Sequence, residues 1–378
     1  MHRHRTRTIH DRFDPERRLA ENEGTLILDR ELDLDPGRGL GPGQKLDPDR
    51  DPDLDLDRHE ARPVEELFVE CYPGVRRALR HALIPGVVLV SVDGLTGAVG
   101  YLSLAADVGR PAAAIIGRHG RADLRLSRDP RVALRHMAVV LLPGEPRRVL
   151  LLDLNTGQGF EDERGVVQRA VLADGPVVFR LGRYVVFLLG SALARGMPMD
   201  AREAWARIPA RVYLDEAAEE EAAARAPEAG AVGAARGPDR EDEVSAPCVT
   251  HVSRIEAPRP AQRDLVEPGE QPLGELVVCV RGGGCELVRL GAAALARGVL
   301  VGRYERCATA VIRDGGRASV SRVHLLVIQL DGGLYAIDTA STNGSWVDGQ
   351  EVRVVGLQDG ARVALGGEDT WVEWRVLN

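Results

Sequence analysis

The stretch Asp338–Gly349, DTASTNGSWVDG, places polar and turn-forming residues side by side between two apolar runs. Ser341, Thr342 and Asn343 each offer a side-chain donor and acceptor, and Gly344 allows the backbone conformations that tight turns use. A tight turn needs fewer hydrogen-bonding side chains than this stretch contains, which leaves the others available to a ligand. The stretch therefore predicts a loop at a strand end that binds a polar ligand.

The sequence around this loop is typical of antiparallel β-structure. Short apolar runs such as ELVVCV, HLLVIQL and LYAID follow one another from Glu275 to the C-terminus. The same texture begins at Gly86 with VVLVSVD, GYLSLAA and AAAIIGR, and it continues to about Gly190. Short strands without intervening helices favour a sandwich or barrel. We therefore expect a mainly β fold with two sandwiches, at residues 86–192 and 273–378.

Two segments lack the residues that fill a core. Residues 1–61 are rich in Asp and Pro and include DPDRDPDLDLDR, so we expect a disordered N-terminal tail. Residues 215–272 begin with ten acidic residues and three arginines between Asp215 and Val244, in a background of Ala, Gly and Pro. This composition predicts a flexible acidic linker between the two sandwiches.

Two shorter segments are expected to be helical. Residues 62–85 carry apolar positions at helical spacing, interrupted by Pro73 and Gly74. Residues 193–214 contain a short helix around EAWARI, because Asp200 and Glu203 have the spacing of a capping box.

Composition argues against several classes of protein. The chain has 378 residues, a net charge of -8 and 44% hydrophobic residues, enough for more than one core. Its arginines are scattered over an acidic chain, so no nucleic-acid surface is expected. No window approaches the roughly 18 to 20 apolar residues of a membrane span, and no signal peptide follows the basic start. Only Lys45 among 49 basic residues is a lysine, which is typical of a GC-rich bacterial genome.

The cysteines and acidic clusters predict no metal and no other cofactor. Five cysteines are widely spread and include no CxxC pair, which favours reduced thiols in the cytoplasm. Alternating aspartates at 53–57 resemble the start of a calcium loop. However, an arginine and a valine occupy the positions of the turn glycine and the bidentate glutamate.

Three polar clusters in the last β-region point to a binding site. They are Gly302–Arg303, Ser321–His324 and Ser341–Gly344, and strand ends of a sandwich can bring them to one edge. Arginine offers a planar fork of donors that suits phosphate oxygens, and the serine hydroxyl adds another donor. The amide of Asn343 can donate to and accept from an extended peptide backbone. Because no nucleophile lies beside a base, the clusters predict phosphopeptide binding and no catalysis.

Taken together and in this order, the motifs resemble the forkhead-associated (FHA) domain. Gly-Arg, Ser-x-x-His and Thr-Asn-Gly occur within about 45 residues, with an Asp before and Val-x-Gly after the last motif. The resemblance covers about residues 273–378. It implies an eleven-stranded β-sandwich whose apical loops bind phosphothreonine.

The resemblance also implies roles for single residues. Arg303 and Ser321 would contact the phosphate, with Arg322 as a helper. Thr342 and Asn343 would hold the phosphothreonine methyl group and the peptide backbone. The loops would be shaped by Gly302, His324 and Gly344. We expect His324 to act as scaffold, because a lone histidine is more often packed in a core. Some members carry a basic residue where this chain has Ser319, so the peptide preference stays open.

The implied partner is a phosphothreonine-containing protein or peptide, connected to a bacterial Ser/Thr protein kinase or its substrate. An intramolecular partner is an alternative, because Thr6, Thr8 and Thr25 lie in the tail and two of them stand among arginines. The simpler interpretation is that they are ordinary tail threonines.

The first β-region repeats the pattern of the second. Gly117–Arg118 matches Gly302–Arg303, residues 132–136 (VALRH) match 320–324 (VSRVH), and Asp153–Gly159 matches Asp338–Gly344. The aspartate-to-glycine spacing is six residues in both copies, and the spacing from that glycine to a later Asp-Gly turn is fifteen in both. The repeat of about 100 residues predicts a second FHA fold.

The binding chemistry of this first copy is eroded. Ala133, Gly157 and Gln158 replace the phosphate-binding serine, the threonine and the asparagine. Arg118 and Arg135 remain and could bind an anion weakly. We expect a degenerate copy that serves packing or docking.

Two alternatives to a phosphothreonine-binding adaptor stay open. Both sandwiches could dock partners independently of phosphate, as in a structural protein of a larger assembly such as a secretion system. An enzyme fused to an FHA module is disfavoured, because no segment outside the two repeats is long and apolar enough for a catalytic domain.

Overall fold

The computed structural model describes residues 30–31, 62–82, 84–105, 109–144, 147–214, 249–259, 264–314, 319–331 and 333–377. The expected disordered tail, apart from residues 30–31, lies outside the described residues, and so do Thr6, Thr8 and Thr25. Residues 215–248 of the expected acidic linker also lie outside them.

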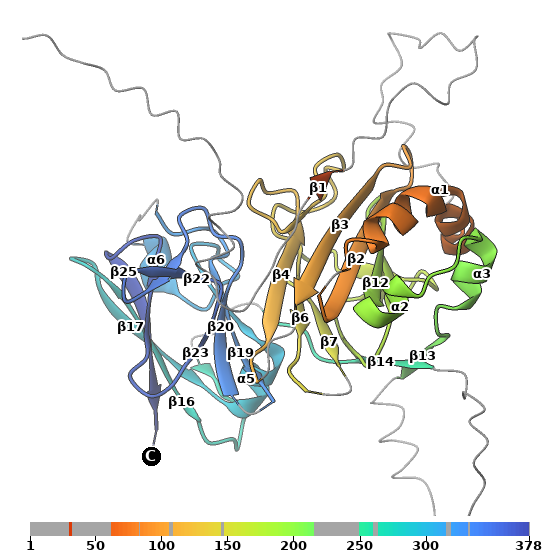
Figure 1. The fold of residues 1–378 in the computed structure, drawn as a ribbon. Helices are drawn as coiled ribbons and strands as arrows, with labels where there is room; N and C mark the ends of the chain where they lie inside the picture. Colours follow the sequence, from red (N-terminus) through yellow and green to blue (C-terminus); the bar gives the residue numbers. More distant parts are fainter. Residues whose placement is uncertain are drawn as a thin grey trace, which may run out of the picture.

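The first half of the described chain is a sandwich of two seven-stranded sheets (Figure 1). One sheet contains, in spatial order, β1 (Arg30–Glu31), β3 (Val99–Ala105), β2 (Gly86–Asp93), β12 (Tyr184–Gly190), β11 (Val177–Leu181), β8 (Phe160–Asp162) and β9 (Val167–Gln168). The other contains β13 (Arg211–Leu214), β14 (Thr250–Arg254), β10 (Ala170–Ala173), β7 (Val149–Asp153), β6 (Met137–Leu141), β4 (Ala112–Gly117) and β5 (Leu124–Arg125). Leu89, Leu102, Ile116 and Phe179 are among the apolar side chains that fill the space between the two sheets.

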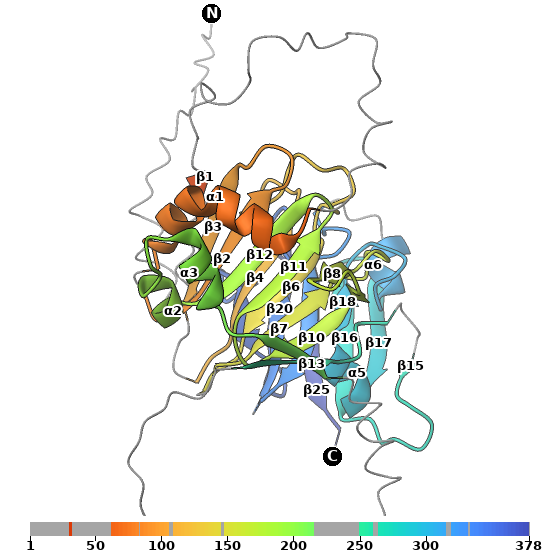
Figure 2. The same cartoon turned by 90° about the vertical axis from the view of Figure 1, so that its right-hand side faces the viewer.

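Three helices cover the outer face of the first of these sheets. They are α1 (Val64–Leu79), α2 (Ser191–Arg195) and α3 (Ala201–Ala206), and Figure 2 shows them gathered over β2 and β12. Phe68 of α1 packs on Phe187 of the sheet with ring centroids 5.2 Å apart. Asp200 caps α3, because its side chain accepts a hydrogen bond of 2.8 Å from the backbone N–H of Glu203.

The second half is a sandwich of one seven-stranded and one four-stranded sheet. The larger sheet contains β15 (Asp264–Leu265), β17 (Gly284–Leu290), β16 (Gly274–Val280), β25 (Thr370–Val376), β24 (Arg362–Leu365), β21 (Ser345–Val347) and β22 (Gln350–Val352). The smaller contains β18 (Val299–Val301), β19 (Leu325–Leu330), β20 (Gly333–Asp338) and β23 (Val354–Gly356). The short helices α5 (Ala292–Arg297) and α6 (Ala310–Asp314) lie between strands.

The two sandwiches share one strand order. The run β3-β2-β12-β11-β8-β9 of the first corresponds to β17-β16-β25-β24-β21-β22 of the second. The run β4-β6-β7-β10 likewise corresponds to β18-β19-β20-β23. Among the described strands, pairing is antiparallel except for β4 with β5, β13 with β14 and β15 with β17. The internal repeat seen in the sequence is therefore also a repeat of topology.

The corresponding sheets of the two sandwiches pack face to face. Figure 1 shows the strands of these two sheets lying beside each other. Apolar side chains of the β4-β6-β7-β10 sheet and of the β18-β19-β20-β23 sheet form one buried cluster. Its members include Ile115, Val140 and Leu152 from the first sandwich, and Leu326 and Ile337 from the second. Strands β4, β6 and β7 are consequently buried along their whole length.

The structure corrects two expectations. Residues 215–272 are not a linker throughout, because β14 lies inside the second sheet of the first sandwich, between β13 and β10, and β15 joins the second sandwich. The cysteines are not all reduced, because Cys279 and Cys285 form a disulfide across the register of β16 and β17. Disulfides persist in oxidising environments, so the cysteines no longer favour a reducing compartment.

Candidate functional site

The four-stranded sheet of the second sandwich brings the three polar clusters to one end. Val301 at the end of β18 pairs with Leu325 at the start of β19, which pairs with Asp338 at the end of β20. The loops that follow or precede these three positions therefore meet. We call this loop set the rim; it contains residues 302–309, 319–324 and 339–344.

Backbone and side-chain hydrogen bonds connect the loops of the rim. The N–H of Arg303 donates to the carbonyl of Ser321 at 3.1 Å, and the N–H of Thr342 donates to Ser321 Oγ at 2.9 Å. Gly302 has to be glycine at this position, since an added Cβ would lie 2.3 Å from the carbonyl oxygen of Arg322. The rim is therefore built for close approach of backbone segments.

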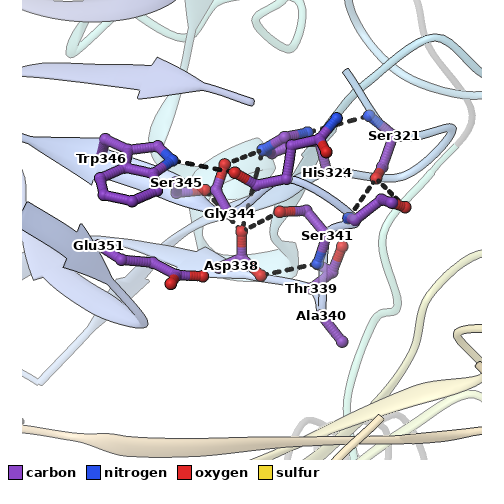
Figure 3. A network of polar contacts seen from close by, with 12 residues as sticks. Ser321, His324, Asp338, Thr339, Ala340, Ser341, Gly344, Ser345, Trp346 and Glu351 are labelled. Atoms are coloured by element: carbon purple, nitrogen blue, oxygen red, sulfur yellow. Dashed lines mark hydrogen bonds and ion pairs between the residues drawn. The ribbon is translucent and has the colours of Figure 1, made fainter. Parts of the chain in front are cut away.

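His324 holds two loops of the rim together from inside. Its side chain is fully buried, its Nδ1 accepts from the N–H of Ser321 at 3.0 Å, and its Nε2 donates to the carbonyl of Gly344 at 3.1 Å (Figure 3). Burial lowers the pKa of His324 to about 4, against the opposing attraction of Asp338. The imidazole is therefore neutral at pH 7.

Several polar groups of DTASTNGSWVDG hydrogen-bond to one another within the turn. Asp338 accepts hydrogen bonds from the N–H of Ser341 at 2.8 Å, from Ser341 Oγ at 2.6 Å and from Ser345 Oγ at 2.7 Å (Figure 3). Ala340 within this turn has a φ of 57°, which a residue with a Cβ rarely adopts. The carboxylate thus fixes a constrained turn. Sequence reasoning did not assign Ser341 this structural role.

A smaller part of the stretch is exposed beside arginines. Thr342 and Asn343 are exposed, and the Asn343 amide uses one N–H on the carbonyl of Ser319 at 2.8 Å. Arg303 is half-buried, and its Nε donates to the carbonyl of Val320. Arg322 is exposed. Among the residues that the structure describes, no carboxylate pairs with either arginine, which leaves both guanidinium groups available to an anion.

Ser321 differs from its neighbours because it is buried. Only 5% of its surface is exposed, and its Oγ lies 3.4 Å from Thr342 Oγ1. The residue that covers it comes from the first sandwich: Arg135 Nη2 lies 3.3 Å from Ser321 Oγ. The sequence placed Arg135 in the first copy but did not predict this contact, because motif spacing within one sandwich does not show which residues of another sandwich lie beside it.

The equivalent loops of the first sandwich keep the same frame. Arg118 Nε donates to the carbonyl of Val132, as Arg303 does to Val320. His136 Nδ1 accepts from the N–H of Ala133 at 3.1 Å, and its Nε2 donates to the carbonyl of Gly159 at 2.7 Å. The frame is retained although the serine, threonine and asparagine of the rim are replaced.

The described residues lack a metal cluster and a membrane-spanning helix. No three or more His, Cys, Asp or Glu side chains among them are grouped so that they could hold a metal ion. Within the same part of the chain, no helix is both long and apolar enough to cross a membrane. The rim combines cationic, hydroxyl and amide groups, which suit an anionic ligand carried on a peptide.

An eleven-stranded sandwich with a cationic loop rim at one end defines a class of peptide-binding module. Residues 299–366 match the family model described as the FHA domain. No curated protein matches the chain. The second sandwich is therefore an FHA domain.

Solved FHA structures resemble part of the chain. One is Rv1747 FHA-1 of Mycobacterium tuberculosis, 28% identical, which covers 29% of this chain and 100% of that chain with a TM-score of 0.24. Another is the FhaA FHA domain complexed with the intracellular domain of Rv3910, 27% identical, covering 27% and 99% with a TM-score of 0.21. A third is the FHA domain of CT664 from Chlamydia trachomatis, 23% identical, covering 27% and 95% with a TM-score of 0.22.

The family match does not extend to the first sandwich. Its relation to the FHA domain rests on the shared strand order and the shared loop contacts.

Proposed function

We propose that the chain is a non-catalytic adaptor whose FHA domain binds a phosphothreonine-containing segment of a partner protein. The observation that carries this proposal is the gathering of Arg303, Ser321, Arg322, Thr342 and Asn343 at one end of the sandwich. The guanidinium groups of both arginines face no carboxylate of the described residues.

Each group has a role that its position supports. Arg303 and Arg322 would neutralise the phosphate, and the hydroxyl of Ser321 would donate to one of its oxygens. Thr342 would contact the phosphothreonine methyl group. Asn343 retains its amide oxygen and one N–H for the peptide backbone.

The expected affinity is moderate and depends on the phosphate. Hydrogen bonds to charged groups contribute about 1.5 to 3 kcal/mol each, and association costs several kcal/mol. A few such contacts correspond to a micromolar dissociation constant, or about -8 kcal/mol. Such binding is reversible, as a kinase-controlled interaction requires. On this basis we place the protein downstream of a Ser/Thr protein kinase.

A phosphothreonine peptide library tests the proposal. The full chain should retain peptides that carry phosphothreonine and not their unphosphorylated forms, and Arg303→Ala should weaken binding about 10- to 100-fold. Arg289→Ala is the matched control, because Arg289 is an exposed arginine on β17, away from the rim. Equal retention of phosphorylated and unphosphorylated peptides would reject the proposal and favour a phosphate-independent docking protein.

The same assay tests whether a phosphorylated threonine of the N-terminal tail is the ligand. Phosphorylated peptides that span Thr6, Thr8 or Thr25 should compete with library peptides if the partner is intramolecular. Absence of competition would leave a separate partner protein as the ligand.

A further inference from the structure

The docking of the two sandwiches places a loop of the first one against the rim of the second. The β4-β6-β7-β10 sheet packs on the β18-β19-β20-β23 sheet through a shared apolar cluster. Residues 132–136 precede β6, as the rim residues 319–324 precede β19. The loop before β6 and the rim therefore lie at the same end of the interface.

Arg135 of that loop reaches into the rim. Its Nη2 and Nε donate to the carbonyl of Ala340 at 2.8 and 3.1 Å. The same Nη2 lies 3.3 Å from Ser321 Oγ and 3.5 Å from Thr342 Oγ1. Arg135 thus contacts two of the five residues that would hold the phosphothreonine, and only 9% of its surface is exposed.

Within the part of the chain that the structure describes, the hydrogen-bond partners of Arg135 are all uncharged oxygen atoms. Burial lowers the pKa of Arg135 to about 10, and the neighbouring charges of Arg322 and Arg121 act in the same direction against Asp338. A buried cation without a carboxylate within ion-pair distance is costly unless an anion joins it. The rim is where an anion is expected.

Arg135 does not belong to the inherited FHA motif. In the alignment of the repeats, His136 corresponds to His324, so Arg135 corresponds to Val323. Val323 packs in the apolar cluster between the sandwiches. The first sandwich therefore carries an arginine at a position where the second carries an interface valine.

We propose that Arg135 is a phosphate-binding residue of the FHA site, supplied by the first sandwich to the rim of the second. This inference rests on the proposed function. A phosphate oxygen bound to Ser321 Oγ would lie within reach of Arg135 Nη2, since the two protein atoms are 3.3 Å apart. Arg303, Arg322 and Arg135 would then surround the phosphate from both sandwiches.

The sign of the charge separates this role from that of a blocking residue. A side chain of the protein that blocks the site by mimicking the phosphate would carry negative charge, as a carboxylate does. Arg135 carries positive charge, which attracts the phosphate dianion and strengthens the field of Arg303 and Arg322. The eroded first copy would thus contribute to the phosphopeptide site.

Binding of the phosphothreonine peptide library by the full chain tests the inference. Arg135→Met removes the charge and keeps an unbranched apolar side chain, and it should weaken binding about tenfold or more. Arg148→Met is the matched control, because Arg148 pairs with Asp331 across the same interface at the opposite end of the strands. This control should stay within about twofold of the wild type.

The outcomes distinguish the inference from the proposed function. If Arg303→Ala abolishes phosphate-dependent binding while Arg135→Met binds as the wild type does, the inference is wrong and the proposed function stands. Tighter binding by Arg135→Met would also overturn it, because Arg135 would then block the rim. If the wild type does not discriminate phosphorylated peptides, the proposed function fails and the inference fails with it.

A measurement on the unchanged chain covers the case in which Arg135→Met fails to fold. The Nε–Hε nuclear magnetic resonance of Arg135, assigned by its loss in Arg135→Lys, should shift when a phosphothreonine peptide is added. The unphosphorylated peptide should leave it in place. The inference would be overturned if the phosphorylated peptide shifts the backbone amide resonances of the rim and leaves the Arg135 Nε–Hε resonance unchanged.

Discussion

Ser341 and Thr342 are neighbours in the sequence, but one is buried inside the turn and the other is exposed on the rim. Ser341 is fully buried and donates to Asp338 at 2.6 Å, whereas Thr342 is exposed on the rim. The motif spacing predicted the position of both, along with Arg303 and Asn343. The spacing could not predict that Ser341 is buried and Thr342 is exposed, because this depends on the direction of the Asp338 side chain.

Alanine substitutions at these two positions should have different effects. Ser341→Ala should lower the free energy of unfolding by about 1 to 3 kcal/mol, because it removes a buried hydrogen bond to a carboxylate. Thr342→Ala should leave stability almost unchanged and weaken phosphopeptide binding. Urea unfolding and peptide titration of both variants check this. Equal stability of Ser341→Ala and the wild type would contradict it.

His324 predicts how stability depends on pH. Its pKa is lowered to about 4 in the folded chain and is about 6.5 when unfolded, so between these values the unfolded chain binds a proton that the folded chain does not. The free energy of unfolding should therefore fall as the pH drops from 6.5 to 4 and should not change above 6.5 through this group.

Urea unfolding across this pH range measures the effect. His324→Gln should lose part of the decline between pH 6.5 and 4, while His251→Gln, at an exposed position, should keep it. An unchanged slope in His324→Gln would show that other groups produce the decline.

At the scale of elements, the sequence predicted most strands of the two sandwiches but not β14. Its five residues, THVSR, include only one apolar residue, Val252, so the run lacks the apolar texture that marks most of the other strands. Pairing with β13 and β10 holds β14 in the sheet, and Val252 is buried in the core of the first sandwich. The strand therefore depends on tertiary pairing, which composition cannot report.

Val252 should consequently contribute to the stability of the first sandwich. Val252→Ala should lower the free energy of unfolding by about 1 to 3 kcal/mol, since it opens a cavity in the core. Val212→Ala on the adjacent β13 is the control, because Val212 is 43% exposed and should change stability little. Urea unfolding compares the two, and similar values would mean that β14 adds little to the core.

At the scale of the whole molecule, each sandwich contacts the other through an arginine at an equivalent position. Arg121 and Arg306 occupy equivalent positions four residues after Gly117 and Gly302. Arg121 Nη1 donates to the carbonyl of Thr342 at 2.6 Å, and Arg306 Nη1 donates to that of Asn155 at 2.9 Å. Each sandwich thus reaches the equivalent loop of the other, as in an isologous interface.

One signal of this docking was present in the sequence. Outer strands of a sandwich that face water alternate between apolar and polar residues, whereas AAAIIG, MAVVL and VLLLD are apolar at almost every position. Such runs indicate burial on both faces. They do not indicate what covers the outer face, so the docking partner became known only from the structure.

The shared cluster predicts that the two sandwiches unfold together. Trp205 lies in the first sandwich and the other three tryptophans, Trp346, Trp371 and Trp374, lie in the second. Fluorescence of a Trp205→Phe variant and of a variant that retains only Trp205 should therefore give coincident urea transitions.

Ala138→Asp puts a charge into the fully buried interface, so it should lower the free energy of unfolding by about 3 kcal/mol and separate the two transitions. Leu287→Asp, at a leucine that is 46% exposed on β17, should leave them coincident. Separate transitions in the parent variants would show that the sandwiches are independent, and Arg135 would then reach the rim only when they happen to be docked.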